Sequence, residues 1–362
     1  MEKFGFIMHP LDAKRDIARK YPFVKYLPSA ALEYGLKFKS PMAISHIKGV
    51  VSADGAEAEG WFVGCWLTPR QMLRLPTDLV YEKIIAAGRV AQEQGAKIVG
   101  LGAFTSVVGD GGKTIAANLD IAVTTGNSYT VATALEGALK AAEMMDINPS
   151  EAVAAVVGAA GSIGRTCSEV LADEVAALRL VGLATDPLGE IAQSLSGKKA
   201  NVEVYSEVAA GLRDADIVIA VSSAVDAIIH PEHLKSGAVV CDVARPRDVS
   251  VRVVKERDDV LVIEGGVVAV PGDVNFGFNF GFPPKTAYAC MSETMMLALE
   301  GRYESYTLGK EVSVAQVREM SSLAQKHGFK LAGFRSFEKP VTEEQIARIR
   351  ANVRHLAADE RR

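Results

Sequence analysis

Two features of the sequence combine residue types and spacings that suit chemistry. One is the stretch VVGAAGSIG, where Gly158, Gly161 and Gly164 lie three residues apart, and the other is Cys290 in AYACMSETMM. Glycines at this spacing suit a nucleotide phosphate, because they admit close backbone approach and the following helix N-terminus favours an anion. A cysteine on a helix can act as a nucleophile, or it can pack as a small apolar residue.

The residues around the glycine turn predict a strand before it and a helix after it, which is the context that the motif requires. Gly158 would allow the tight turn, Gly161 the approach of a pyrophosphate, and Gly164 the close packing of helix on strand. Ser162 and Ile163 begin the helix and are predicted to contact the cofactor phosphates. The alternative is a close-packed strand–helix turn that binds no ligand.

Later apolar segments continue the alternation of strand and helix. Strands are predicted at 178–184, 215–223, 237–244 and 260–266, which is the pattern of a doubly wound parallel sheet. Ligands bind at the carboxyl ends of such strands, so Val221 and Ser222 are further candidate cofactor contacts.

The choice between NAD and NADP depends on the end of the second strand. The segment there reads GLATDP, without a basic residue for the 2′-phosphate, and Asp186 comes late for a ribose contact. Thr185 could bond a phosphate or a hydroxyl, so both dinucleotides stay open.

The rest of the chain also predicts an α/β protein. In the amino half, strands are expected at 4–9, 45–52, 60–67 and 97–104, the middle two as a hairpin, and helices at 77–94 and 128–145. The break at Asn148-Pro149 and the change of pattern after Pro284 give three predicted regions. These are an α/β substrate domain at 1–148, a Rossmann-type dinucleotide-binding domain at 149–284, and a helical region at 285–362 that carries Cys290. The expected fold class is therefore a doubly wound parallel sheet that follows an N-terminal α/β domain, with C-terminal helices.

A helix that opens at Pro284 would place Cys290 two turns in, on a face of small residues with Ala287 and Thr294. Something must approach that face closely, either a neighbouring helix or a ligand. A nearby helix N-terminus, with Lys285, would favour the thiolate. The phenylalanines of 276–282 alternate with small or polar residues, as in a strand with four rings on one face, which could line an acyl tunnel or belong to the core.

Composition excludes several classes of protein. The formal charge is −4 and no long run of Lys and Arg occurs, so binding to nucleic acid through phosphate neutralisation is not expected. No stretch reaches the roughly 18 apolar residues of a membrane span, and the first residues resemble neither a signal peptide nor an anchor. The four cysteines form no CxxC pair and no metal-ligand spacing. We expect a cytoplasmic protein with free thiols and no metal.

Several stretches together resemble the long-chain acyl-acyl-carrier-protein reductases, the aldehyde-forming enzymes of cyanobacterial type. The matching stretches, in order, are FGFIMH (4–9), GCWLTP (64–69), LGAFTSVV (101–108), TTGNSYT (124–130), VVGAAGSIG (156–164), EGGVV (264–268), AYACMSETMMLALEG (287–301) and KHGF (326–329). The resemblance reaches most of the chain, and the combination is far more specific than any single motif.

The resemblance implies reduction of a fatty acyl thioester to an aldehyde, with Cys290 carrying the acyl group as an enzyme thioester. It favours NADPH, but the missing basic residue leaves NADH possible. The acyl donor would be acyl carrier protein or acyl-CoA. Oxyanion stabilisation would fall to Thr125, Asn127 or the backbone at Gly266, although helix capping explains the first two equally well.

Other readings remain. His327 is either a proton donor or a helix-end residue. The whole chain could instead be a hydroxy-acid dehydrogenase of shikimate dehydrogenase type, or a dinucleotide sensor without catalysis. Acyl chain length, oligomeric state and the role of the tail after Phe334 are open at this level.

Overall fold

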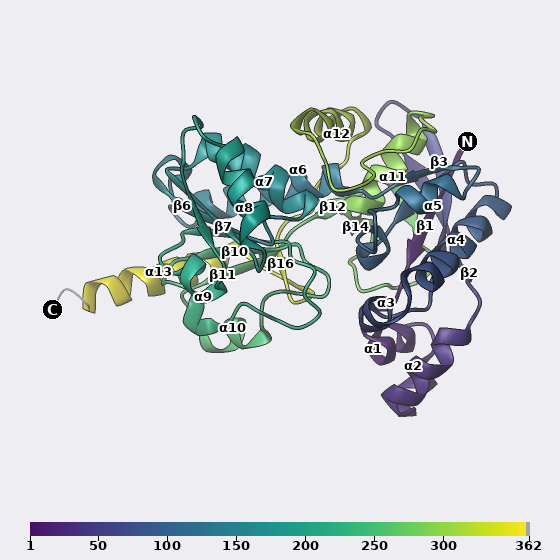
Figure 1. The fold of residues 1–362 in the computed structure, drawn as a ribbon, viewed down its shortest axis with the longest axis horizontal. Helices are drawn as coiled ribbons and strands as arrows, with labels where there is room; N and C mark the ends of the chain where they lie inside the picture. Colours follow the sequence, from purple (N-terminus) through teal and green to yellow (C-terminus); the bar gives the residue numbers. More distant parts are fainter. Residues whose placement is uncertain (360–362) are drawn as a thin grey trace. The chain divides into compact units, whose positions relative to one another are not determined.

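The chain, described by a computed structural model over residues 1–359, forms two compact units, each built from separate stretches (Figure 1). The first unit comprises Met1–Tyr129 and Val268–Lys330, and the second comprises Thr130–Val267 and the described residues from Leu331 on. These boundaries differ from the predicted ones at 148 and 284. Most of helix α6 (Asn127–Met144) belongs to the second unit, and helices that follow residue 284 return to the first.

A six-stranded mixed sheet forms the centre of the first unit, in the order β13-β2-β3-β1-β4-β5. Strand β1 is parallel to β3 and β4, and β4 is parallel to β5, whereas β2 is antiparallel to β3 and to β13. The predicted hairpin is therefore confirmed as the pair β2–β3. The strands of this unit are β1 (Glu2–Met8), β2 (Met42–Val51), β3 (Glu57–Gly64), β4 (Ile98–Leu101), β5 (Ala122–Thr124), β13 (Gly272–Asn275) and β14 (Thr286–Tyr288).

Helices cover this sheet and extend beyond it. They are α1 (Ala13–Ala18), α2 (Ser29–Phe38), α3 (Pro69–Arg74), α4 (Thr77–Glu93), α5 (Lys113–Ala117), α11 (Ala289–Leu299) and α12 (Val314–His327), with 3-10 turns η1 (Pro22–Tyr26) and η2 (Ala103–Ser106). Helix α11 is apolar on nearly all sides and packs on β1 and β4, as a fully buried helix must. A Cβ at Gly100 of β4 would lie 2.1 Å from the Thr294 hydroxyl, so only glycine lets α11 come this close.

The second unit holds a six-stranded sheet of the order β11-β10-β9-β6-β7-β8, in which every pair is parallel. Its strands are β6 (Val153–Val157), β7 (Ala177–Val181), β8 (Asn201–Tyr205), β9 (Ile217–Ala220), β10 (Val239–Asp242) and β11 (Leu261–Glu264). Its helices are α7 (Ser162–Glu174), α8 (Thr185–Ser194), α9 (Val208–Leu212), α10 (Val251–Glu256) and the C-terminal α13 (Glu343–Asp359), with 3-10 turns η3 (Pro149–Glu151) and η4 (Pro231–His233).

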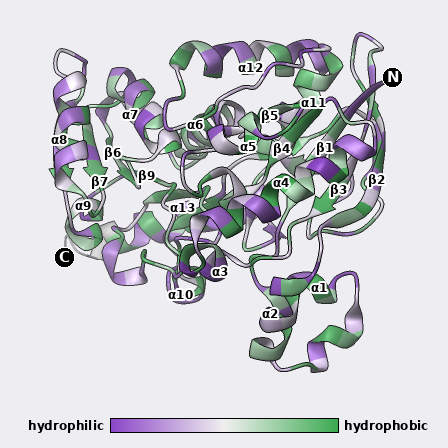
Figure 2. Ribbon diagram, turned by 45° about the vertical axis from the view of Figure 1, so that its right-hand side comes forward, coloured by the Kyte–Doolittle hydropathy of each residue, from purple (hydrophilic) through white to green (hydrophobic). Residues whose placement is uncertain are grey.

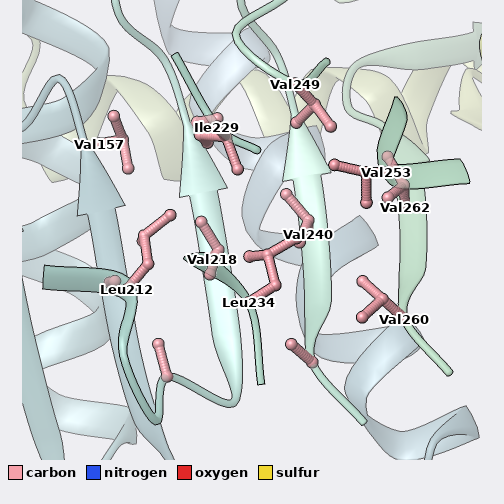
Figure 3. Close-up of a cluster of buried hydrophobic side chains, with 14 of the residues drawn as sticks. Val157, Leu212, Val218, Ile229, Leu234, Val240, Val249, Val253, Val260 and Val262 are labelled. Atoms are coloured by element: carbon pink, nitrogen blue, oxygen red, sulfur yellow. The ribbon is translucent and has the colours of Figure 1, made fainter. Parts of the chain in front are cut away.

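Apolar β-branched side chains fill the core of this sheet. Val157, Val218, Val240 and Val262 from four strands lie in one buried cluster with Leu212 (Figure 3). Strands buried on both faces carry continuous apolar runs, which is why the sequence indicated them clearly. The exception is β8, an edge strand with exposed residues, which the sequence analysis missed.

The remaining elements complete the C-terminal part. Short strands β12 (Val267–Ala269) and β15 (Lys330–Leu331) lie where the chain passes between units, and β16 (Arg335–Ser336) pairs with β17 (Lys339–Pro340). Helix α13 begins with the predicted capping box, since Thr342 and Gln345 exchange hydrogen bonds of 2.9 and 3.2 Å. The expected fold class is confirmed, with two α/β units and C-terminal helices. No helix in residues 1–359 is long and apolar enough to cross a membrane.

Candidate functional site

Cys290 lies in the first turn of α11, closer to the helix N-terminus than the sequence predicted. Tyr288 is the N-cap, so Cys290 is the second helical residue. The helix does not open at Pro284, because Pro283 and Pro284 lie in a turn closed by the Thr286 backbone and hydroxyl on the Pro283 carbonyl, 3.2 and 2.8 Å away. The short strand β14 follows that turn, and only then does α11 begin.

Accessibility distinguishes Cys290 from the other cysteines. Cys65, Cys167 and Cys241 are 0% exposed, whereas Cys290 is half-buried. Burial raises the pKa of the Cys65 thiol to about 11 and that of Cys241 to about 12, and it raises the pKa of Cys167 further. These three are inert packing residues, since only the thiolate is a good nucleophile.

The turn between β5 and α6 is in close contact with Cys290. Gly126, at φ +73°, is so close that an added Cβ would lie 2.2 Å from the Cys290 Cβ and 2.3 Å from its Cα. The small-residue face of α11 is thus approached by strand and turn backbone, at Gly100 and Gly126. The N-terminus of α6 therefore lies close to Cys290.

The two polar residues predicted in this turn are buried. The Thr125 hydroxyl donates to the Thr307 carbonyl at 2.7 Å, so its proton holds the turn in place. Asn127 is the first residue of α6, one position after Gly126. Lys285, by contrast, forms an ion pair with Asp273 at 2.9 Å at the surface.

A buried carboxylate, Glu293, was missed by the sequence analysis. Its Oε2 accepts hydrogen bonds from the Ser128 hydroxyl at 2.5 Å and the Tyr129 backbone N–H at 2.9 Å. Its Oε1 accepts from the Thr124 hydroxyl at 2.6 Å, with the Thr307 hydroxyl 3.1 Å away. One 0%-exposed side chain therefore fixes the α6 N-terminus that faces Cys290.

Burial raises the pKa of Glu293, while these hydrogen bonds oppose the rise. The signal for this residue was present in the sequence. Glu293 is the one charged residue in the run 289–299, three positions after Cys290 and so on the same side of the helix.

The phenylalanine segment, residues 276–282, is not the strand that the alternation predicted. Positive φ angles at Gly277 and Gly281 bend the chain after β13 ends. The rings still form a continuous series, with Phe62–Phe280, Phe280–Phe282 and Phe282–Tyr288 centroids 5.3, 5.2 and 4.3 Å apart. Phe276 is buried and the later rings are half-buried, so this series of rings leads to the N-cap of the Cys290 helix.

His327 is placed away from the thiol. It is buried at the end of α12, with Nδ1 2.7 Å from the Ser52 hydroxyl and Nε2 2.7 Å from Glu300 Oε1. Glu300 caps the carboxyl end of α11, about 16 Å from its start at 1.5 Å per residue. The geometry therefore favours a helix-end role for His327 over proton donation at Cys290.

In the second unit, each glycine of the glycine turn has a geometric reason. Gly158 has φ +87°, and a Cβ there would lie 2.7 Å from the Ser222 Cα. Gly161 is the N-cap of α7, and a Cβ at Gly164 would lie 2.3 Å from the Gly158 carbonyl oxygen. The turn thus carries no side chain at Gly158 and Gly161, which allows the close backbone approach that a bound pyrophosphate needs.

The turn after β9 lies beside these glycines and is held by a second residue that the sequence analysis missed. Asp248 accepts hydrogen bonds from the Ser222 backbone N–H at 2.9 Å and from its hydroxyl at 2.6 Å. Both Ser222 donors are thus occupied, so Ser222 positions the turn at Val221 rather than offering a free donor. Asp248 itself is fully buried, and burial raises its pKa.

Two other predicted contacts also lie in the second unit. Thr185 is the exposed first residue of α8. Gly266 follows β11 at φ +76°, and the preceding Gly265 packs so closely that a Cβ would lie 2.6 Å from Val243.

In residues 1–359, no group of three or more His, Cys, Asp or Glu side chains is arranged to hold a metal ion.

We expect Gly158→Ala to weaken binding of NADH and NADPH at least about tenfold, because the added methyl overlaps Ser222 and strains a positive φ. Titration of each dinucleotide by fluorescence or calorimetry measures the loss. Gly189→Ala is the matched control, since nothing lies within 4 Å of a Cβ there. Equal affinities of Gly158→Ala and the parent, at unchanged thermal stability, would contradict the assigned turn.

The parallel sheet with its glycine turn defines a Rossmann-type NAD(P)-binding domain of the oxidoreductase kind. Residues 139–264 match the family described as shikimate/quinate 5-dehydrogenase. This match covers about a third of the chain, the part that holds the glycine turn and strands β6 to β11.

Similarity to individual proteins extends over nearly the whole chain. The aminotransferase PigE of a Serratia species is 28% identical over 365 residues, which cover 98% of this chain but 42% of that protein. The chain therefore spans about two fifths of that relative's length. The long-chain acyl-[acyl-carrier-protein] reductase of Synechococcus elongatus is 25% identical over 351 residues, covering 90% of this chain and 98% of the relative. Among solved structures, L-tryptophan dehydrogenase from Nostoc punctiforme superposes with a TM-score of 0.41 at 11% identity, over 97% of this chain and 88% of that one.

Proposed function

We propose that the protein reduces a fatty acyl thioester to an aldehyde, with Cys290 as the acyl acceptor and NAD(P)H as the reductant. The observation that carries the proposal is the position of Cys290. It is the accessible cysteine of the four, and it lies in a helix first turn against the N-terminus of a second helix. The distant similarity to the acyl-[acyl-carrier-protein] reductase supports the same chemistry.

The first step is a thioester exchange at Cys290. The thiolate Sγ attacks the carbonyl carbon of the acyl donor, a new C–S bond forms, and the donor leaves as a thiol after taking a proton. One thioester replaces another, so the step is nearly thermoneutral and depends mainly on activation of the sulfur. The α6 N-terminus, held by Glu293, provides an electrostatic environment for that activation.

The second step consumes one hydride, which carries two electrons, and one further proton. The glycine turn at Gly158, Gly161 and Gly164 would hold the dinucleotide phosphates, and a reduced nicotinamide bound there supplies hydride. Reduction of the acyl carbon breaks the bond to Sγ and returns Cys290 as a thiol with release of the aldehyde. Overall, acyl thioester, NAD(P)H and a proton give aldehyde, free thiol and NAD(P)⁺.

The aromatic side chains that lead to the start of the Cys290 helix support an alkyl-chain substrate. The phenylalanine segment offers half-buried rings that continue to Tyr288, two residues before Cys290. Apolar aromatic walls suit an alkyl chain better than a small polar acid. We propose acyl carrier protein or acyl-CoA as the acyl donor.

The direct test is intact-protein mass spectrometry after incubation with palmitoyl-CoA and no dinucleotide. We expect one adduct of acyl mass, removable by hydroxylamine and absent from Cys290→Ala. Cys65→Ala, which removes a buried thiol, is the matched control and should keep the adduct. An adduct of equal yield on Cys290→Ala would contradict the role of this sulfur.

A dehydrogenase acting on a hydroxy acid is the second candidate, favoured by the match of residues 139–264 to the shikimate/quinate dehydrogenase family. Reduction of NADP⁺ or NAD⁺ in the presence of shikimate or quinate, with no acyl adduct, would favour it. Tight dinucleotide binding with neither activity would instead indicate a sensor.

A further inference from the structure

A small helical lobe, residues 12–40, extends from the first unit after β1. It consists of α1, η1 and α2, which contact one another, and both views show it standing apart from the sheet (Figures 1 and 2). Strand β1 is parallel to β4, and β4 to β5, so the lobe leaves the same sheet edge as the turn that faces Cys290.

The lobe has a small core and an exposed aromatic surface. Ala13, Ile17, Val24 and Leu36 pack with Trp66 beneath it. Four of the five large aromatic side chains of the lobe, in contrast, are exposed, with exposed fractions of 65% for Phe23, 79% for Tyr26, 68% for Tyr34 and 62% for Phe38. Packing within the lobe therefore does not explain why these four positions are aromatic. Monomeric proteins rarely expose several large apolar side chains on one small element.

The charge of the lobe is opposite to that of the rest of the chain. It holds seven basic and three acidic side chains, a net charge of +4, which leaves −8 on the remaining residues. The cations lie among the aromatic rings. The Lys25 ammonium is 4.9 Å from the Tyr26 ring centroid and that of Lys37 is 5.8 Å from the Phe38 ring. Such a charge distribution turns the lobe toward an anionic surface.

The lobe also adjoins the phenylalanine segment. The Lys20 ammonium lies 5.8 Å from the Phe278 ring centroid, and a Cβ at Gly281 would lie 2.3 Å from the Arg19 guanidinium. From Phe280 the rings continue through Phe282 to Tyr288. The exposed aromatic surface is thus connected, within one unit, to the apolar side chains that lead to the Cys290 helix.

We propose that this lobe docks the protein on the surface of an anionic lipid bilayer. Phe23, Tyr26, Tyr34 and Phe38 would enter the headgroup region, where aromatic side chains are favoured, and the lysines would meet lipid phosphates. The protein stays peripheral, because no described helix can span a bilayer. An acidic carrier protein would match the charge, but four protruding rings with flexible cations fit a deformable apolar interface better than a hydrogen-bonded protein surface. The inference rests in part on the proposed function, which gives an alkyl-chain product a reason to leave toward lipid.

Vesicle co-sedimentation tests docking without any thioester or dinucleotide. We expect the protein to pellet with phosphatidylcholine vesicles that contain about a third phosphatidylglycerol, weakly with phosphatidylcholine alone, and less as salt rises. Phe23→Ser/Tyr26→Ser should weaken partitioning at least about tenfold. Each of Lys25→Ala and Lys37→Ala should weaken it about fivefold.

The controls separate docking from folding and from catalysis. Val251→Ser/Val254→Ser on α10 removes two exposed apolar side chains beside basic Arg252 and Lys255, and should bind vesicles like the parent. Cys290→Ala should also bind normally, so failure of the proposed chemistry would leave this result unchanged. Failure to bind anionic vesicles overturns the proposal, as does equal binding by Phe23→Ser/Tyr26→Ser. If Phe23→Ser/Tyr26→Ser lost binding to purified acyl carrier protein but not to vesicles, the lobe would instead be a protein-docking surface.

Discussion

Replacing Cys290 by alanine is expected to abolish aldehyde formation and to leave dinucleotide binding intact. The expected loss in kcat is a factor on the order of 10⁴ or more, since the variant cannot form the acyl-enzyme. The substitution removes one half-buried sulfur atom, and alanine is well tolerated in a helix, so α11 should remain folded. Aldehyde is measured by gas chromatography, and dinucleotide affinity by titration, on the same protein preparation.

Serine at the same position separates nucleophile from shape. Cys290→Ser keeps the volume but supplies an alcohol that stays protonated, so it should be nearly as inactive as alanine. Cys65→Ala and Cys241→Ala remove buried thiols, and their effects should appear in stability and not in the acyl-transfer step. Turnover of Cys290→Ala within tenfold of the parent would contradict the thioester mechanism.

Glu293→Ala is expected to damage both stability and activity. Buried donors at Thr124, Ser128 and Tyr129 lose their acceptor, which should lower the free energy of unfolding by about 3–5 kcal/mol. The turn at Gly126 would then shift against Cys290. A displacement on the order of 1 Å there should reduce aldehyde formation about a hundredfold. Urea unfolding and initial rates measure the two effects.

Glu293→Gln is the conservative control. Its carbonyl oxygen can still accept from Tyr129, while the hydroxyls of Thr124 and Thr307 can rotate to accept from its NH₂ group. We expect a loss of about 1 kcal/mol in stability and less than a tenfold loss of activity. Equal damage by Ala and Gln would show that charge matters more than the hydrogen-bond geometry.

The stability difference between the parent and Glu293→Gln should depend on pH in a definite direction. Burial raises the pKa of Glu293 above its ordinary value near 4.5, so the folded protein binds this proton more tightly than the unfolded chain does. The stability from this group is therefore complete below about pH 4.5 and is lost as pH rises through the folded pKa. Since Gln does not titrate, the deficit of Glu293→Gln should be largest at low pH and shrink as pH rises. A deficit that grows with pH would contradict the direction of the shift.

Local patterns explain what could be predicted from the sequence. The parallel sheet was visible because strands such as β6 and β10 are apolar throughout, and the glycine turn because three glycines stand at fixed spacing after a strand. The start of α11 was misplaced, because a Pro-Pro pair fits a helix first turn and a tight turn equally well. Only the backbone at Lys285, with φ +60°, decides between them.

Long-range contacts explain what could not be predicted. Glu293 binds Ser128 and Thr124, which lie 165 and 169 residues earlier, and Asp248 binds Ser222 from 26 residues away. Periodicity carries no information on such pairs. The make-up of the two compact units depends on such contacts as well, since residues 268–330 return to a sheet begun by residues 2–8.

That return of the chain has a consequence for synthesis on the ribosome. The second unit's parallel sheet is complete once residue 264 has emerged, but the first unit still lacks β13 and α11. Strands β1 to β5 are synthesised early, and they stay partly uncovered while more than 150 further residues are made before helix α11 can pack on them. A nascent chain of this design depends on slow closure of distant segments, and it exposes apolar strand faces to chaperones until α11 has been synthesised.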